Sequence, residues 1–512
     1  MCYTYPMTLT ANAAVMGLAF LVTSAGAQQI NIRDVASRSQ LFIDRELVYE
    51  SKGVAFTPHP ARKHPSGPLL RADQPWEGWY VTVFTGTVLF DDEERVFKMW
   101  YTCPGNPEYF DSGIICYALS DDGIVWKKPA VGTLVAKNGK PHNAVSAFHG
   151  PSVFKDTADA DPSKRYKMLC HDRARGYMAQ VSPDGLHWRD FGDRPIVPIS
   201  YVDDVISAFR DHRSGRFVAL PKMTTPIFGR QRRTIYLSTS RDFMEWTKPE
   251  LAFAADRRDD LGSLARIERA RPLLNYPDNW NVMRTEFYGA GAYSAESCVV
   301  GFPWVFTINA NVKPGTNQEG PIETQLAVSR DLEHWHRPFR TPILPPGKPG
   351  DWDGGMILTA SQAIDVGDEV RLYYGGTNYT HGAPILYGSA SEKRGTDYTG
   401  AIGLATWQRD RFVSADATDA GTLTTVPIRF TGQRLELNAS TAEGGEIRVE
   451  MLDAAGRPLE GTGISDTVRG DSLRHAVRFS GLPDLKAISA RPICLRFHLR
   501  HASLFSFAFR EK

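Results

Sequence analysis

A seven-residue phrase with the pattern Ser-x-Asp-x-x-x-Trp occurs four times in this sequence. The copies occupy residues 120–126, 182–188, 240–246 and 329–335. Each follows a short apolar run typical of a β-strand, and a strand-and-turn unit that recurs in this way predicts a fold of repeated small sheets. The Ser and Asp side chains can form hydrogen bonds inside a tight turn, and the Trp can cover the preceding strand. We therefore interpret the phrase as part of the scaffold rather than as a site of chemistry.

The strand-like runs around these copies fall into five groups. They are 81–90, 96–102 and 114–119; 152–154, 165–170 and 177–181; 205–210, 216–220 and 234–239; 286–293, 298–308 and 324–328; and 356–364, 369–374 and 385–389. Five sheets of three or four short strands predict an all-β fold, a five-bladed β-propeller. We expect residues 402–406 and 411–413 to end it. Residues 256–284, without a strand pattern, predict a loop or short helix over one face.

The two ends of the chain differ from this repeated middle. Residues 1–27 contain an apolar core followed by small residues up to Ala27, which is typical of a cleaved secretory signal and predicts a secreted or periplasmic protein. From about residue 423 the pattern changes to alternating strands at 434–438, 446–452, 473–479 and 493–499. We expect a propeller over residues 40–415 and a small β-sandwich over 420–512.

Composition narrows the classes of partner. The 512 residues are 42% hydrophobic and carry a formal net charge of +1, with both signs interspersed. Nothing therefore indicates a nucleic-acid surface or a polybasic membrane patch, and no later stretch is long enough to span a bilayer. No cysteine or histidine spacing indicates a metal site, and no motif indicates a cofactor. Small neutral partners are favoured.

Several motifs give the chain a resemblance to a known group. They are residues 64–65 and 75–78, the Lys-Met-Trp-Tyr run at 98–101, the four repeated phrases, and Trp-Asp-Gly-Gly at 352–355 leading to 372–376. In these the chain resembles five-bladed glycosidases of the invertase, arabinanase and β-mannoside phosphorylase type. It is most similar to secreted bacterial proteins with a glycoside hydrolase family 32 N-terminal-like domain. The Trp-Asn-Asp-Pro-Asn and Arg-Asp-Pro signatures of true invertases are absent.

The resemblance implies hydrolysis of a glycosidic bond in a poly- or oligosaccharide. This chemistry usually needs two carboxylic groups, one that protonates the leaving oxygen and one that attacks carbon or activates water. In a propeller, residues at the start of each inner strand converge on a central funnel. The carboxylates at those places are Asp73 and Glu77 in the first group, Asp203 and Asp204 in the third, Glu286 in the fourth and Asp353 in the fifth. The second group offers only His149.

Among these we expect Glu286 to be the general acid, with Asp204 or Glu77 as base or nucleophile. Asp203 and Asp204 precede a strand, and because adjacent residues of extended chain point in opposite directions, only one can face the funnel. Arg284 and Glu286 are two apart and share one face of a strand. The remaining predicted contacts to substrate are Asp73, Trp76, Asp203, Arg284, Asp353, His149 and His381. A structural role is the alternative for each of these residues.

Two other functions remain open. The missing carboxylate in the second group favours a propeller that binds carbohydrate without cleaving it. A sialidase-like enzyme is also compatible with the Asp-containing turns. It would need three arginines and a nucleophilic tyrosine, for which Arg284 and Tyr288 are available.

Overall fold

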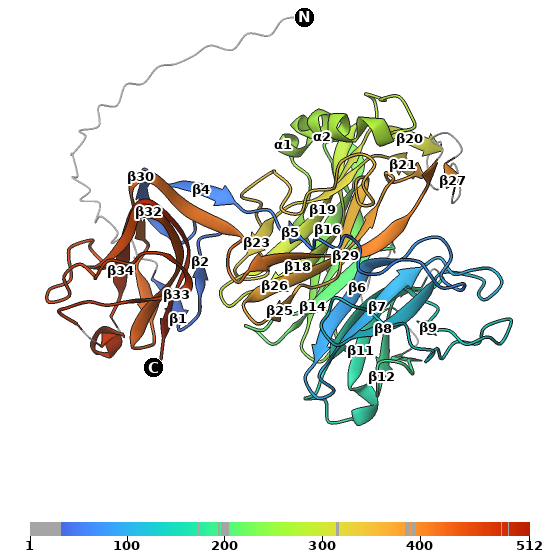
Figure 1. Ribbon diagram of the computed structural model, residues 1–512, viewed down its shortest axis with the longest axis horizontal. Coiled ribbons are helices and arrows are strands. Elements are labelled where there is room, and N and C mark those ends of the chain that lie inside the picture. Colours follow the sequence, from blue (N-terminus) through green and yellow to red (C-terminus); the bar gives the residue numbers. More distant parts are fainter. Residues whose placement is uncertain are drawn as a thin grey trace, which may run out of the picture.

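The computed structural model describes residues 32–172, 174–192, 195, 204–313, 317–383, 390–391, 396–482, 484–489 and 491–511. The expected signal segment and Asp203 lie outside these residues. Strands dominate the described chain, which confirms the all-β prediction. Figure 1 shows two bodies, a larger one formed by the middle of the chain and a smaller one that contains the C-terminal strands. None of the described helices is long and apolar enough to cross a membrane.

The first three groups of strands each form one antiparallel, four-stranded sheet. Sheet 1 contains β6 (Thr82–Asp91), β7 (Val96–Cys103), β8 (Ile114–Ser120) and β9 (Ala144–Ser146); sheet 2 contains β10 (His149–Lys155), β11 (Tyr166–Asp172), β12 (Gly176–Ser182) and β13 (Arg189–Asp190); and sheet 3 contains β14 (Ile206–Arg210), β15 (Phe217–Ile227), β16 (Arg230–Ser240) and β17 (Glu250–Phe253). The expected strand positions agree with these elements to within a few residues, except that β15 and β16 continue beyond the sheet as a long hairpin.

The last two groups are joined by parallel pairings of Ile322 with Met356 and of Ala292 with Gln362. Sheet 4 contains β18 (Arg284–Ser294), β19 (Val299–Ile308), β22 (Ile322–Thr324) and β23 (Ala327–Ser329); sheet 5 contains β24 (Met356–Thr359), β26 (Glu369–Thr377), β29 (Gly400–Gln408) and β5 (Arg62–Lys63), with β25 (Ile364–Val366) paired to β26. Two short hairpins, β20 (Ala310–Lys313) with β21 (Asn317–Glu319) and β27 (Ala390–Ser391) with β28 (Thr396–Asp397), lie beside them.

Sheet 5 differs from the expectation in two strands. Its third described strand is β29, which pairs with β26; the expected strand at residues 385–389 lies outside the described residues. Its outermost strand is β5, which comes from near the N-terminus and pairs Lys63 with Ala405. The sheet is therefore completed by two segments that are more than three hundred residues apart in sequence.

The first strands of the five sheets (β6, β10, β14, β18 and β24), called here the inner strands, lie together in the middle of the larger body. Buried hydroxyl groups connect them. Thr87 Oγ1 lies 2.9 Å from Ser361 Oγ and accepts the Val153 N–H at 2.8 Å. Ser152 Oγ donates to the Thr85 carbonyl and accepts the Ala208 N–H. Side-chain hydrogen bonds thus take the place of a strand ladder where neighbouring sheets meet.

The repeated phrase forms the same turn in all four copies. The Ser hydroxyl accepts the backbone N–H three residues later at 2.9 Å in each copy, and the Asp carboxylate accepts the N–H groups two and three residues after itself. The residue three positions after Ser has a left-handed backbone; it is Gly123, Gly185, Phe243 or Leu332, with φ of 75°, 80°, 67° and 73°. Both bulky residues are buried, so packing offsets their backbone strain.

Each phrase packs against the neighbouring sheet rather than only marking an outer turn. The Gly185 carbonyl accepts the Trp100 indole N–H of sheet 1 at 2.8 Å, and Phe243 packs against Phe154 of sheet 2. The first phrase contacts sheet 5, where the Tyr373 hydroxyl donates to the Gly123 carbonyl at 2.7 Å. The sheets are therefore held in a closed order in which sheet 1 follows sheet 5.

The smaller body is one twisted sheet system around a single core. It contains β1 (Arg33–Ala36), β2 (Gln40–Leu41), β3 (Val48–Lys52), β4 (Ala55–Pro58), β30 (Val413–Thr425), β31 (Ile428–Phe430), β32 (Arg434–Asp453), β33 (Asp471–Val477) and β34 (Ile493–Arg510), with the short helix η3 (Leu485–Ile488). β34 lies between β30 and β32. The strands within residues 33–58 thus pair with the C-terminal strands, whereas the sequence analysis assigned residues 40 onward to the propeller.

The remaining helices are short. They are η1 (Pro162–Lys164), α1 (Arg257–Leu261), α2 (Ser263–Ala270) and η2 (Arg271–Leu273). The last three form the insertion between sheets 3 and 4, which lies at the top of Figure 1. The buried Asp259 of α1 accepts a hydrogen bond from the Arg337 guanidinium at 2.7 Å, which anchors this insertion on sheet 4.

Candidate functional site

Charged and aromatic side chains gather where the inner strands begin. We call this group the central cluster; it consists of Phe84, His149, Asp204, Lys222, Arg233, Arg284, Glu286, Tyr288, Phe306 and His381. These residues come from all five sheets or from the segments beside them. The long β15–β16 hairpin contributes Lys222 and Arg233, and β18 contributes the largest share. The cluster is the place where residues from distant parts of the chain bring opposite charges and aromatic rings together.

Glu286 is almost fully buried in the central cluster, with 1% of its side chain exposed. Arg233 Nη1 lies 2.6 Å from Oε2, and Arg284 Nε lies 2.6 Å from Oε1. The predicted pairing of Arg284 and Glu286 on one strand face is therefore present. Both carboxyl oxygens thus accept a charge-assisted hydrogen bond from a guanidinium group. These contacts disagree with the predicted role of Glu286 as the general acid and fit a positioning role.

Asp204 is the more accessible carboxylate. Its side chain is 45% exposed, and its Oδ1 lies 2.5 Å from Nζ of Lys222, whose side chain is only 1% exposed. The ammonium of Lys222 also lies 3.9 Å from the ring centre of Tyr288, an attractive cation–π distance. Lys222 thus links Asp204 to Tyr288 and favours the ionised form of the carboxylate.

His381 orients Tyr288. Its Nδ1 lies 2.6 Å from the Gln318 carbonyl oxygen, which can only accept, so Nδ1 carries the proton. Burial and the charge of Arg233 lower the pKa of His381 to about 4, so the ring is neutral at pH 7. Its Nε2, 3.2 Å from Tyr288 Oη, is then the acceptor of the phenol proton. The phenol oxygen therefore has a base beside it and a cation over its ring.

Aromatic rings complete one wall of the central cluster. Phe84 of β6 lies 4.8 Å from the His149 ring and 6.3 Å from the Tyr288 ring, measured between ring centres. Phe306 lies 4.7 Å from His381. His149, the histidine proposed for the carboxylate-free second group, thus packs against the same phenylalanine as Tyr288.

Glu77 lies outside the central cluster, in the core of sheet 1. It is fully buried, and it accepts the Asp73 and Gln74 N–H groups at 3.1 and 3.0 Å, the Tyr101 hydroxyl at 2.6 Å and the Lys128 ammonium at 2.8 Å. Every one of these contacts fixes the loop before β6. The expectation that Glu77 is a base or nucleophile does not fit this environment, which leaves the carboxylate no access to a substrate.

Three further expected substrate contacts also have structural partners. Asp73 is paired with Lys128 at 2.7 Å, and the Trp76 indole donates to Asn143 at 2.7 Å. Asp353 is 3% exposed and binds Lys63 at 2.6 Å and the Tyr374 hydroxyl at 2.9 Å, which ties β5 into sheet 5. None of the three contacts a member of the central cluster.

Sequence reasoning missed Lys222 and Arg233. It considered only residues at the start of inner strands, whereas these two lie on the second and third strands of sheet 3, beyond the region where the sheet has its four strands. One signal was available, because Lys222 follows the wholly apolar and buried run 217–221 and is itself buried. In the described part of the chain, no group of three or more histidine, cysteine, aspartate or glutamate side chains is placed to hold a metal ion.

Comparisons with known proteins give structural likenesses only. No family model and no curated protein sequence matches the chain. Solved structures that are similar include a thermostable family-43 glycoside hydrolase, with 15% identity over 67% of this chain and 95% of that one and a TM-score of 0.43. A structure from the GH130 family of mannoside phosphorylases has 12% identity over 70% of this chain and 97% of that one, at a TM-score of 0.41.

A third likeness is to an N-acetylgalactosamine deacetylase from F. plautii in complex with blood group B trisaccharide. It has 14% identity over 70% of this chain and 97% of that one, with a TM-score of 0.40. The structural neighbours thus include glycoside hydrolases and a protein that acts on another bond of a sugar. At these values the likenesses assign no activity to this chain.

Proposed function

We propose that sheets 1 to 5 are the blades of a five-bladed β-propeller and that the smaller body is a β-sandwich packed beside it. Two features support this architecture. The inner strands are linked through the hydroxyl groups of Thr87, Ser152 and Ser361. The repeated phrases link each of sheets 1 to 4 to the sheet before it, including sheet 1 to sheet 5 through Tyr373. In a propeller of this kind the central cluster lies at the mouth of the funnel.

The proposed function is hydrolysis of a glycosidic bond in a poly- or oligosaccharide at the central cluster. The observation that carries it is the connected series Asp204, Lys222, Tyr288 and His381. The buried ammonium of Lys222 lies between two groups in this series. One is the half-exposed carboxylate of Asp204, and the other is the phenol of Tyr288, which has His381 beside it as a base. An ionised oxygen that can attack an anomeric carbon or activate water is what this reaction needs.

Two assignments of the attacking group follow. Asp204 is the preferred base or nucleophile, because Lys222 holds it as a carboxylate. Tyr288 is the alternative nucleophile. Its proton would pass to His381 Nε2 and from there to the leaving oxygen, and the positive charges of Lys222 and Arg233 over its ring would favour the phenolate. This second arrangement corresponds to the sialidase-like expectation, which needs three arginines and a nucleophilic tyrosine. Two arginines, Arg233 and Arg284, lie together here because both contact Glu286.

A release assay with the mature protein tests the proposal. Reducing-sugar formation is measured over a broad panel of polysaccharides and aryl glycosides, and a responsive substrate is then given to the Asp204→Asn and Tyr288→Phe variants. We expect Asp204→Asn to lower kcat by about 10²–10⁴-fold, the usual contribution of a catalytic acid or base. Trapping with a fluorinated glycoside and peptide mass spectrometry identifies which of the two oxygens becomes glycosylated. Full activity in both variants would exclude this site.

The second candidate function is binding of carbohydrate without cleavage. It is favoured by the observation that Asp204 and Glu286 are both held by cations. Glycan binding without release of reducing ends, lost equally in Asp204→Asn and Arg233→Ala, would support it. Secretion remains a proposal too; export of the full-length chain followed by N-terminal sequencing should show a mature protein that begins after Ala27.

A further inference from the structure

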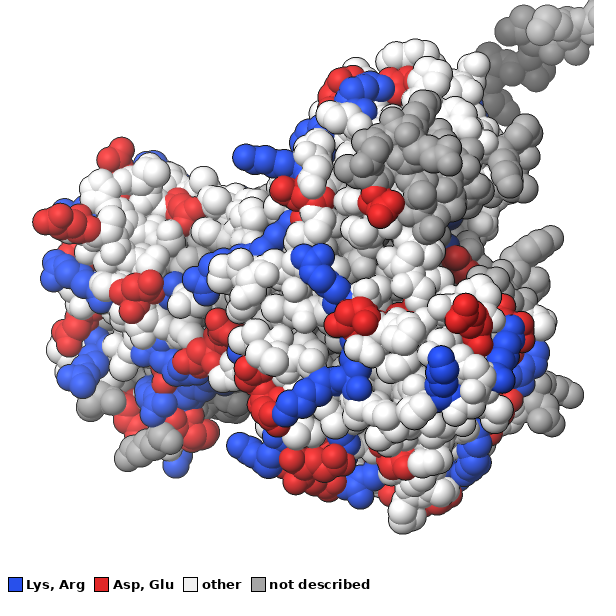
Figure 2. All heavy atoms as spheres, turned by 45° about the vertical axis from the view of Figure 1, so that its right-hand side comes forward, with Lys and Arg blue, Asp and Glu red and all other residues white. Residues whose placement is uncertain are grey.

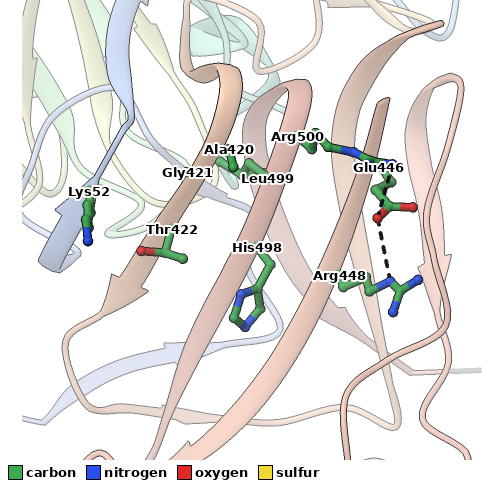
Figure 3. Close-up of a pocket in the computed structure, with 9 residues that line it drawn as sticks. All are labelled: Lys52, Ala420, Gly421, Thr422, Glu446, Arg448, His498, Leu499 and Arg500. Carbon is green, nitrogen blue, oxygen red and sulfur yellow. Dashed lines mark ion pairs between the residues drawn. The ribbon is translucent and has the colours of Figure 1, made fainter. Parts of the chain in front are cut away.

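The smaller body has a groove on its surface, away from the central cluster. The groove has a volume of about 380 Å³ and lies over β3, β30, β34 and β32. Figure 3 shows the side chains that line it, with Lys52 on one side, Thr422 and His498 across the floor, and Glu446, Arg448 and Arg500 on the other side. No part of the central cluster contributes to it.

Strand register explains how the lining is arranged. Lys52 pairs with Thr422, Thr422 with His498, and His498 with Arg448, so these four residues form one row across four strands. Side chains in such a row point to the same face of a sheet. With strands about 4.8 Å apart, the row from Lys52 to Arg448 spans about 14 Å. This length suits two or three sugar units of an extended chain.

The row contains hydrogen-bond donors and cations but no carboxylate. Lys52 and Arg448 mark its two ends, and the Thr422 hydroxyl and the His498 imidazole lie between them. The next row on one side supplies Glu446, which lies 3.5 Å from Arg500 and 4.0 Å from Arg448. The next row on the other side supplies Glu450, which lies 3.4 Å from His498 Nε2 and 3.2 Å from Arg496.

The lining therefore has an excess of positive charge. It contains three permanent cations, Lys52, Arg448 and Arg500, against the single carboxylate Glu446, a net charge of 3 − 1 = +2. Glu446 also forms an ion pair with Arg469, at 2.7 Å. The side chains of Arg448 and Arg500 are 44% and 52% exposed, so their guanidinium groups remain accessible to a ligand.

We propose that this groove binds an anionic polysaccharide, one that carries carboxylate or sulfate groups. The two ends of the row would each take one anionic group, and Thr422 and His498 would bond the hydroxyls between them. Arginine and lysine are suited to both kinds of anion. The site is separate from the proposed catalytic cluster and would hold the protein on a polymer while the larger body acts.

Other ligand classes fit the groove less well. No phenylalanine, tyrosine or tryptophan is among its lining residues, so it lacks the large stacking surface that bases of single-stranded nucleic acid or the faces of neutral sugars use. The chain as a whole has a formal net charge of only +1, and Figure 2 shows both signs interspersed over one face of the molecule.

Affinity electrophoresis of the full mature protein tests the proposal. The gels contain polygalacturonate, dextran sulfate, unmodified dextran or double-stranded DNA. We expect retardation by polygalacturonate or dextran sulfate, decreasing with added salt, and none by dextran. Whichever of the two charged polymers binds identifies carboxylate or sulfate as the recognised group. Lys52→Ala and Arg448→Ala should each weaken binding by about tenfold, as expected for loss of one charge-assisted hydrogen bond.

Arg429→Ala is the matched control. Arg429 is an exposed arginine on β31 of the same body, outside the groove, and its removal lowers the net charge by the same amount. We expect it to leave binding unchanged, and all three variants to keep the wild-type melting temperature. Equal losses in Arg429→Ala and Arg448→Ala, no retardation by either charged glycan, or tighter binding to DNA than to both glycans would each overturn the proposal.

Discussion

Replacing Gly123 by alanine tests whether the first repeated phrase closes the ring of sheets. Gly123 has φ of +75°, and an added Cβ would lie 2.6 Å from the Tyr373 hydroxyl oxygen and 3.0 Å from an Arg371 guanidinium nitrogen, both in sheet 5. A left-handed backbone costs a residue with a Cβ about 1–2 kcal/mol. Overlap in a packed interior costs about 1–3 kcal/mol more. We therefore expect Gly123→Ala to lower the free energy of unfolding by roughly 2–5 kcal/mol.

Two companion variants separate the backbone cost from the overlap. Gly229 has nearly the same φ, +74°, but nothing lies within 4 Å of an added Cβ, so Gly229→Ala should cost only about 1–2 kcal/mol. Tyr373→Phe removes the hydroxyl that donates to the Gly123 carbonyl at 2.7 Å, for about 1–3 kcal/mol. In the double variant Gly123→Ala/Tyr373→Phe the overlap with the hydroxyl is gone. Its total effect should be smaller than the sum of the single effects by at least about 1 kcal/mol.

Urea unfolding followed by tryptophan fluorescence and circular dichroism measures these differences. The deciding quantity is the coupling energy between positions 123 and 373, rather than the effect of either single variant. Two results would contradict this reasoning: a loss of unfolding free energy in Gly123→Ala no larger than in Gly229→Ala, or additive losses for Gly123→Ala and Tyr373→Phe. Either would mean that the contact between sheets 1 and 5 does not hold the ring of sheets closed.

Three further predictions concern buried carboxylates. Glu77→Ala should lower the free energy of unfolding by about 3 kcal/mol, because it leaves Lys128 short of a buried partner; an unchanged urea midpoint would contradict the structural role. Glu286→Gln should release Arg233, and we expect a raised KM with a smaller change in kcat, since Glu286 positions the site without donating a proton; loss of kcat alone would restore it as the general acid. Burial raises the pKa of Asp410 above its usual 3.8. A raised pKa in the folded state means that this group supports folding at low pH and that the contribution is lost as the pH rises through the folded pKa. Asp410→Asn should therefore become increasingly more stable than the wild type from about pH 4 upward in urea unfolding; a difference independent of pH would refute this.

Much of the fold follows from local patterns in the sequence. The repeated phrase forms one turn with one set of hydrogen bonds, so each copy places the strand before it, as β8, β12, β16 and β23 show. Pairings between distant segments have no local signal. The completion of sheet 5 by residues 62–63 and the joining of residues 33–58 to the C-terminal strands depend on which edges are left unpaired after the rest has folded, which periodicity cannot reveal.

The candidate site was predictable where strands fix side-chain direction. Asp204, Arg284 and Glu286 lie at the start of inner strands, and the structure brings all three into the central cluster. Glu77 lies in an irregular loop, where no period of two relates neighbouring side chains, and it points into the core of sheet 1. The contact of Glu286 with Arg233 had no local signal in the sequence, because Arg233 reaches it from a hairpin whose length depends on tertiary contacts.

The position of residues 33–58 also sets the order in which the protein can be completed during synthesis. β3 and β4 pair with β30, and β1 pairs with β31, so the first strands to leave the ribosome have no partner until more than three hundred further residues have been made. During that time their edges are open to other chains. Strands β1, β3 and β4 can therefore complete their sheet only after β30 and β31 have been synthesised.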